Sequence, residues 1–280
     1  MPRKNPLKTS GIMEGVFLPA LFGPAIYLLT KTPGALYKII VSGLIIFAGF
    51  IFSLKSKNPR SRDLWKTTAA LGAGFWIFTL FRYLRFVSWP LGKAGSINEC
   101  LGLVLFHVVF VLCIFVPLLW ICGKKTLERG MEWGNWGALS PGWKGRKLFG
   151  GILLVAVIWT VWMIVRTPHS GGRIAYLFFP AAIIKGFLTA GGEEVSFRGV
   201  LQKAAVSRYG AAWGILLQAV LYTVFHLNLG PAIFPFPFFI ASVFLLGIVF
   251  GYVTYKIGGI GWAFTVHFLI DLVIEWQHLS

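Results

Sequence analysis

The sequence predicts an all-α protein, a polytopic transmembrane helical bundle of eight or nine spans. Of its 280 residues, 57% are hydrophobic and only 12% are charged, a composition typical of membrane proteins. Several apolar runs reach the roughly 20 residues that a helix needs to cross a bilayer. Lipid cannot satisfy the polar groups of a backbone, so only helices and closed barrels span it, and uninterrupted apolar runs exclude the alternating pattern of a barrel.

Nine apolar segments follow one another along the chain. Their approximate bounds are 12–30, 35–54, 66–90, 101–122, 148–165, 174–208, 211–229, 236–256 and 259–276. The first is the weakest, because Glu14 and two prolines interrupt it, and the third carries two arginines near its end. The fourth is the cleanest, since it has no formally charged side chain. These interruptions leave the expected count at eight or nine spans.

The longest polar stretch, residues 123–147, divides the chain into two parts. Residues 1–147 are expected to form an N-terminal transmembrane block of four spans that ends in this polar linker. Residues 148–280 are expected to form a second helical domain. Every feature that indicates chemistry lies in the second part.

Basic residues in the connecting loops predict the orientation. With the N-terminus in the cytoplasm, the outside loops contain only Lys31, Lys93, Arg166 and Arg173, and the other basic residues of the loops lie inside. We therefore expect an integral protein of the cell (plasma) membrane with a cytoplasmic N-terminus. The net charge of +17 comes largely from these short loops, so the expected partners are membrane lipids with anionic headgroups and not nucleic acid.

Two adjacent acids stand out in the sixth segment. Glu193 and Glu194 are the only acidic residues between positions 134 and 270. A carboxylate near bilayer depth is costly and therefore indicates a functional site. Glu194 and Arg198 are four residues apart with the acid first, the favourable order for an ion pair on a helix. Glu193 lies about 100° further round the same helix and is free to face elsewhere.

A predicted helical hairpin places His226 at the same depth in the membrane as Glu193. Segment 174–208 is too long for one span, so its last turns are expected to project toward the cytoplasm. Tyr209 and Gly210 can form the turn before the chain re-enters the membrane. Glu193 and His226 are equally distant from this turn, and equal distance in an antiparallel pair means equal height. The hairpin therefore predicts that Glu193 and His226 face each other.

The last segment contributes a second polar pair. His267 and Asp271 are four residues apart and so share one helix face, as do Tyr222 and His226 in the hairpin. Polar side chains within membrane spans face the bundle interior or a cavity. Three apolar helices therefore each bring polar groups that should converge.

These spacings resemble the three motifs of the CPBP family, which comprises intramembrane CAAX prenyl proteases of type 2 and their bacterial relatives, the Abi proteins. The motifs are Glu-Glu-x-x-x-Arg at 193–198, aromatic-x-x-x-His at 222–226 and His-x-x-x-Asp at 267–271. The resemblance covers roughly residues 148–280 and implies a catalytic helical domain there. Two positions depart from the usual pattern: Tyr222 replaces a phenylalanine, and Asp271 replaces the asparagine of the prenyl proteases, although aspartate occurs in the wider family.

The resemblance implies hydrolysis of a peptide bond by water that a glutamate activates. Glu193 would be the general base and His226 would share the water. His267 and Asp271 would stabilise the oxyanion, or Asp271 would orient His267, because an ionised acid cannot donate. Glu194 and Arg198 would give electrostatic support. The implied site thus has Glu193, Glu194, His226, His267 and Asp271 as catalytic residues, with Arg198 and Tyr222 supporting them.

A zinc site is the alternative chemistry. Glu193, His226 and His267 would form an acceptable ligand set for catalytic zinc. The chain has no His-Glu-x-x-His, which is the usual helical zinc-protease motif. We therefore expect glutamate-type catalysis with no cofactor, and keep zinc as the alternative.

Three functions remain in competition. The first is an intramembrane endopeptidase that cleaves a membrane-anchored or lipidated substrate, including a prenylated CAAX-type chain end. The second is a proton-coupled membrane transporter, which would be expected to show an internal repeat, and none is evident. The third is a non-catalytic membrane protein that retains the fold.

Overall fold

The structure is a computed structural model that describes residues 36–83, 97–134, 173–226 and 236–278, with scattered positions between 150 and 165. Every element in these ranges is a helix, so the predicted all-α class is confirmed for them. The elements are α2 (Leu36–Lys55), α3 (Pro59–Tyr83), α4 (Ile97–Cys122), α5 (Lys124–Gly130), α7 (Arg173–Glu193), the π-helix η2 (Glu194–Leu201), α8 (Gln202–Tyr209), α9 (Ala211–His226), α10 (Phe236–Ile257) and α11 (Gly261–His278).

Among the residues that the structure describes, two helices are long and apolar enough to cross a membrane. They are the 23 residues Cys100–Cys122 of α4 and the 20 residues Phe238–Ile257 of α10, while three shorter apolar helices lie in α2, α9 and α11. The predicted first segment, 12–30, lies outside the described residues, and the fifth is described only at scattered helical positions. The count of eight or nine spans therefore stays a prediction.

Helix α3 begins earlier than the apolar segment predicted at about 66–90, whose last residues lie outside the described part of the chain. We expected the basic residues just before this segment to lie in a loop, but α3 begins at Pro59, so they form its first turns. The reason is local: the Asn58 side chain accepts hydrogen bonds from the backbone N–H groups of Arg60 and Ser61, at 3.0 and 3.4 Å. Asparagine at the N-cap and proline at the first helical position are strong helix starts.

The long sixth segment is helical throughout but changes its helix type. It consists of α7, then η2, then α8, and α9 follows after Gly210. Gly210 has a φ of +83°, a conformation that glycine adopts without strain, and its N–H closes α8 on the Val206 carbonyl at 2.8 Å. The predicted turn at residues 209–210 is therefore confirmed.

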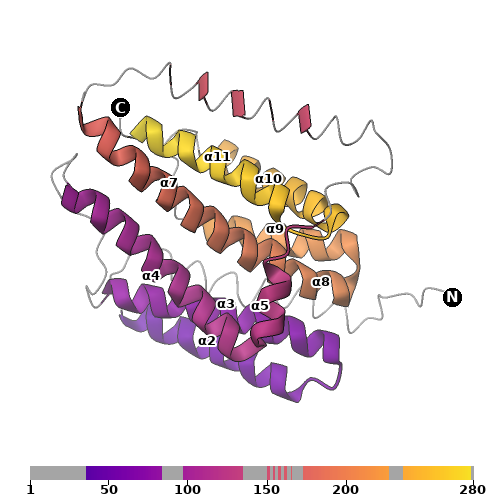
Figure 1. The fold of residues 1–280 in the computed structure, drawn as a ribbon. Helices are drawn as coiled ribbons and strands as arrows, with labels where there is room; N and C mark the ends of the chain where they lie inside the picture. The colour runs from indigo at the N-terminus through magenta and orange to yellow at the C-terminus, as the bar shows by residue number, and fades with distance from the viewer. Residues whose placement is uncertain are drawn as a thin grey trace.

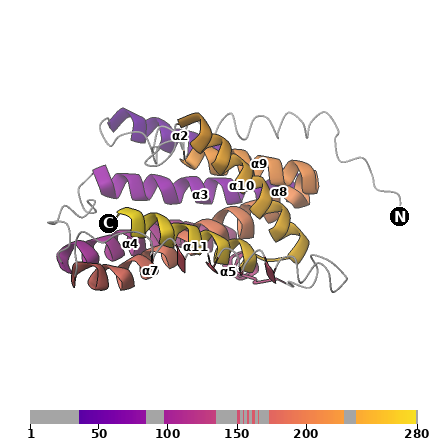
Figure 2. The ribbon, with the colours of Figure 1, turned by 90° about the horizontal axis from the view of Figure 1, so that it is seen from above.

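The helices enclose η2. Neighbouring helices pack in a closed ring in the order α3, α4, α7, α11, α10, α9, α8 and back to α3, and η2 touches helices on several sides of this ring. Figure 1 shows α4, α7 and α11 lying side by side, and Figure 2 shows these three beneath α2, α3, α8 and α9, with α10 crossing from the upper helices to α11. All eight residues of η2 are buried, so the element that carries the acid motif is the centre of the fold.

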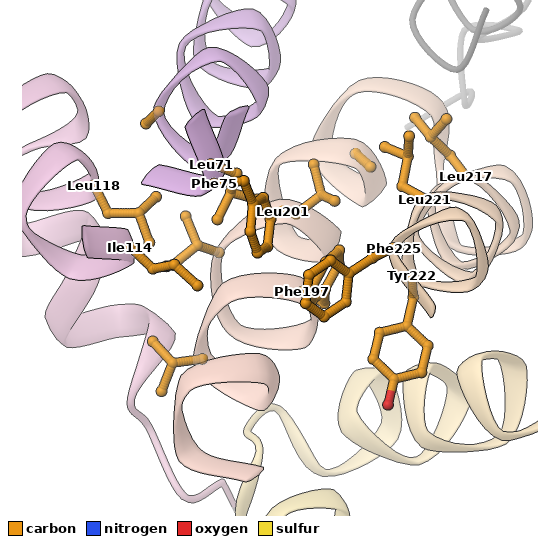
Figure 3. Close-up of a cluster of buried hydrophobic side chains, with 14 of the residues drawn as sticks. Leu71, Phe75, Ile114, Leu118, Phe197, Leu201, Leu217, Leu221, Tyr222 and Phe225 are labelled. Atoms are coloured by element: carbon orange, nitrogen blue, oxygen red, sulfur yellow. The ribbon is translucent and has the colours of Figure 1, made fainter. Parts of the chain in front are cut away.

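One apolar core joins the two halves of the chain (Figure 3). Phe75 of α3 packs against Phe225 of α9 and Phe197 of η2, with ring centroids 4.5 and 6.4 Å apart. Ile114 of α4 belongs to the same cluster. The front helices thus pack directly on the helices that carry the polar motifs, and dispersion between such rings fixes where η2 sits.

The predicted polar linker after α4 also contacts η2. It contains the short helix α5, whose Gly130 backbone lies directly against Gly199 of η2, where any side chain on Gly199 would meet the Gly130 carbonyl. After α5, the carbonyl groups of Glu132 and Trp133 accept hydrogen bonds from the N–H groups of Ile260 and Gly261, at 2.8 and 3.1 Å. This linker therefore ties η2 to the start of α11.

Candidate active site

The two acids lie at the junction between α7 and η2. Glu193 is the last residue of α7 and Glu194 is the first of η2, and their exposed fractions are 4% and 0%. A π-helix inserts extra residues into the helical ladder and often occurs at functional sites. Here the π-helix begins two residues after Gly192, where α7 approaches α4 so closely that a Cβ on Gly192 would lie 3.2 Å from Val111 Cγ2. No sequence pattern indicated a π-helix.

The predicted ion pair between Glu194 and Arg198 is present and buried. Arg198 Nη1 donates to Glu194 Oε1 at 2.9 Å, and both side chains are fully buried. The guanidinium lies 3.8 Å from the centre of the Tyr222 ring and 5.5 Å from that of Phe250. These two aromatic faces supply cation–π stabilisation to a charge that has left water. The contribution of Phe250, from α10, was not predicted, because no motif includes it.

Glu193 faces His226, as the hairpin predicts. Glu193 Oε2 lies 3.5 Å from His226 Nε2, and both residues are buried. His226 Nδ1 lies 2.9 Å from the carbonyl oxygen of Tyr222. A carbonyl only accepts, so Nδ1 carries a proton and Nε2 turns toward Glu193. Glu193 Oε2 has no hydrogen-bond partner among the described residues.

His267 connects the two acids. Its Nδ1 donates to Glu194 Oε1 at 2.8 Å, so this oxygen accepts from both His267 and Arg198. Its Nε2 lies 3.8 Å from Glu193 Oε2 and 3.6 Å from Asp271 Oδ1. The bond between His267 and Glu194 was not predicted, because the rotation of α11 about its axis, which decides this contact, could not be derived from the sequence.

All five candidate catalytic residues and both supporting residues therefore meet around one point at the centre of the bundle. Glu193, His226 and His267 surround it, Asp271 lies beside His267, and Glu194, Arg198 and Tyr222 form the layer behind. In Figure 3 the Tyr222 ring leaves the apolar cluster and points toward the C-terminal helices.

No group of three histidine, cysteine or acidic residues with a geometry suited to a metal ion occurs in the part of the chain that the structure describes. His226 and His267 each have one ring nitrogen engaged by an oxygen atom, and both direct Nε2 toward Glu193. Glutamate-type catalysis and the zinc alternative both remain to be tested by experiment.

The described helices thus bring the buried acids and imidazoles of all three motifs into one cluster. Residues 175–273, which contain all three motifs, match the protein-family model described as Type II CAAX prenyl endopeptidase Rce1-like. The match confirms the family predicted from the motifs, so this region is similar to the CAAX-type intramembrane proteases. Comparison with curated proteins found no match, and comparison with solved structures found none either.

Proposed function

We propose that the protein is an intramembrane endopeptidase that hydrolyses a peptide bond of a membrane-anchored or lipidated substrate, with prenylated CAAX-type chain ends as one such class. One observation carries the proposal: Glu193 Oε2 and His226 Nε2 face each other at 3.5 Å at the buried centre of the fold. Two acceptor atoms at this spacing can share one water molecule, which donates to both.

The proposed reaction begins with this water. Its oxygen attacks the carbonyl carbon of the scissile bond while Glu193 takes one of its protons and His226 holds it in place. The tetrahedral intermediate then collapses, the C–N bond breaks, and the proton on Glu193 passes to the leaving amine. Glu193 suits this role because Arg198 and His267 both donate to Glu194 Oε1, whereas Glu193 Oε2 faces His226 Nε2 and accepts no hydrogen bond from the described residues.

The oxyanion forms on the side of His267. In its protonated form His267 donates from Nδ1 to Glu194 at 2.8 Å, which leaves the N–H at Nε2 for the oxyanion. Arg198 stabilises this arrangement through the shared Glu194 oxygen. The bond from Nδ1 to Glu194 thus holds the His267 ring in place while Nε2 donates to the oxyanion. Such preorganised donors make the largest contribution to the rate enhancement of many hydrolytic enzymes.

The substrate is expected to reach the site from the cytoplasmic side of the plasma membrane, with the N-terminus of the enzyme on that same side. Helix α8, which leads into the turn at Gly210, carries Lys203 near its start and Arg208 in its last turn, and such basic residues are expected on the cytoplasmic side. Anionic lipid headgroups are the expected partners of these residues.

Cleavage of membrane-anchored peptides by purified protein in detergent tests the proposal. The assay uses matched prenylated and unmodified peptides, with and without a chelator, and Glu193→Gln as the inactive control. Cleavage that Glu193→Gln abolishes and that the chelator leaves unchanged supports glutamate-type catalysis. Cleavage that stops with chelator and returns with zinc supports the zinc alternative, and no cleavage of any peptide by the wild type would leave the transporter or the non-catalytic protein.

A further inference from the structure

The polar linker after α4 runs between two of the elements that carry site residues. We call residues 129–134 the linker segment. At one end Gly130 lies against Gly199 of η2. At the other end Gly134 lies against the turn that joins α10 to α11, where a Cβ on Gly134 would come within 2.5 Å of the Gly259 nitrogen. Backbones this close leave no room for side chains, so the path of the segment between η2 and α11 is fixed.

The linker segment also closes the start of α11. The first N–H groups of an α-helix have no partner within the helix. Here the Ile260 N–H donates to the Glu132 carbonyl oxygen at 2.8 Å. The next N–H, of Gly261, donates to the Trp133 carbonyl oxygen at 3.1 Å. The Trp133 ring packs edge-on against Phe264, with ring centroids 5.5 Å apart. The segment therefore contacts α11 through its backbone and through one aromatic ring.

Lys203 holds the same segment from α8. It lies two residues after the end of η2. Its ammonium group donates to the Glu132 carboxylate at 2.8 Å and also to the Arg129 carbonyl oxygen. The side chains of Lys203 and Glu132 are 34% and 52% exposed, so this pair contributes little to the stability of the fold. Glu132 thus contacts α8 through its carboxylate and α11 through its carbonyl.

The proposed reaction depends on where α11 lies. His267 comes less than two helical turns after Gly261, and its Nδ1 donates to Glu194 of η2 at 2.8 Å. Its Nε2 is the proposed oxyanion donor. Between them lies Phe264, which packs on Phe187 of α7 with ring centroids 5.2 Å apart. A displacement of about 1 Å in a catalytic group can lower a rate by about 100-fold.

We propose that Glu132 and Trp133 are positioning residues: Lys203 holds them, and they fix α11 so that His267 Nε2 lies at the oxyanion position. The inference rests on the proposed function. A closed path of contacts carries it, from η2 through α8 to the linker segment, on to the start of α11, and back to η2 through the bond of His267 to Glu194. Neither positioning residue belongs to a motif of the site.

Exchange of the two charges tests the contact with α8. The experiment measures kcat and KM for peptide cleavage by wild type, Lys203→Glu, Glu132→Lys and the variant that combines both. Each single variant places like charges together, so we expect kcat to fall about tenfold and KM to change by less than about threefold. The combined variant restores the attraction, and because residues in contact give non-additive effects, its kcat should return to within about threefold of wild type.

Two substitutions of Trp133 test the contact with α11. Trp133→Phe keeps an aromatic ring against Phe264, so we expect it to retain at least about a third of the wild-type kcat. Trp133→Ala removes the ring and should lower kcat about tenfold, with KM changed by less than about threefold.

Controls separate this inference from the proposed function and from misfolding. Glu128→Lys is the matched charge reversal, since Glu128 pairs with Lys124 within α5, and it should leave kcat unchanged. Thermal denaturation in detergent should give all variants melting midpoints close to that of the wild type. Single variants that cleave at the wild-type rate, a combined variant that stays as slow as they are, equal losses from Trp133→Phe and Trp133→Ala, a loss in KM alone, or losses that follow a lowered melting midpoint would each overturn the inference while wild-type cleavage upholds the proposed function. An inactive wild type overturns both.

Discussion

The two sides of the acid pair differ in how tightly their atoms are bonded. On the Glu194 side, Arg198 and His267 donate to one carboxylate oxygen at 2.9 and 2.8 Å. On the Glu193 side, His226 and His267 approach the carboxylate only to 3.5 and 3.8 Å. The two adjacent glutamates thus differ: Glu194 accepts two short hydrogen bonds through Oε1, and Glu193 faces two imidazoles at longer distances.

This difference indicates that the contacts of Glu194 stabilise the fold and that Glu193 takes part in the reaction. Glu194 Oε1 accepts hydrogen bonds from two donors, and removal of Arg198 leaves the buried carboxylate without its ion-pair partner. A carboxylate oxygen with no hydrogen bond can accept a proton from a bound molecule. The account therefore predicts that variants on the Glu194 side lose stability, and variants on the Glu193 side lose activity.

Arg198→Met should give the largest effect on stability. It leaves Glu194 buried without its cation, so we expect a loss of about 3–5 kcal/mol in the free energy of unfolding. The matched control is the exposed ion pair of the same spacing between Lys124 and Glu128, 3.6 Å apart. Lys124→Met should cost less than about 1 kcal/mol. Thermal denaturation in detergent measures both, and equal losses would contradict the role of burial.

His226→Ala tests the Glu193 side of the acid pair, where a loss of activity is expected to exceed the loss of stability. The imidazole is proposed to hold the attacking water, so we expect a fall in kcat of about 100-fold or more. The melting midpoint should fall by much less than it does in Arg198→Met, because His226 makes one hydrogen bond to a backbone carbonyl. A variant that melts early but cleaves at the wild-type rate would reverse the assignment of the two sides.

Tyr222→Phe should have the smallest effect. The ring beneath Arg198 is kept at its distance of 3.8 Å, and only the hydroxyl group is lost. The Tyr222 hydroxyl interacts with the Arg198 guanidinium, so a loss of about 0.5–1.5 kcal/mol in stability is expected, with kcat nearly unchanged. A large loss of kcat would show that the hydroxyl takes part in the reaction.

The sequence predicted the contacts that depend on helical spacing. The pair of Glu194 and Arg198 follows from four residues along one helix, and the approach of Glu193 to His226 follows from a two-residue turn. In both cases distance along the chain converts directly into distance in space, because short turns and regular helices leave little freedom.

The sequence did not predict contacts that depend on how helices rotate against each other. The bond of His267 to Glu194 and the Phe250 ring over Arg198 each join helices that are far apart along the chain. Their geometry is decided by packing around η2, and no pattern of single residues encodes it. The start of α3 at Pro59 was missed for a different reason, since the basic residues after it resembled a loop.

Comparison of Glu193→Gln with Glu194→Gln tests the central claim most directly. Both variants remove one negative charge from neighbouring positions and keep the shape of the side chain. The account predicts that Glu193→Gln loses cleavage by about 1,000-fold or more and keeps its melting midpoint, since a general base contributes up to about four orders of magnitude. Glu194→Gln should lower the melting midpoint clearly below that of the wild type. Cleavage by Glu193→Gln at the wild-type rate, or the same loss of stability in both variants, would contradict it.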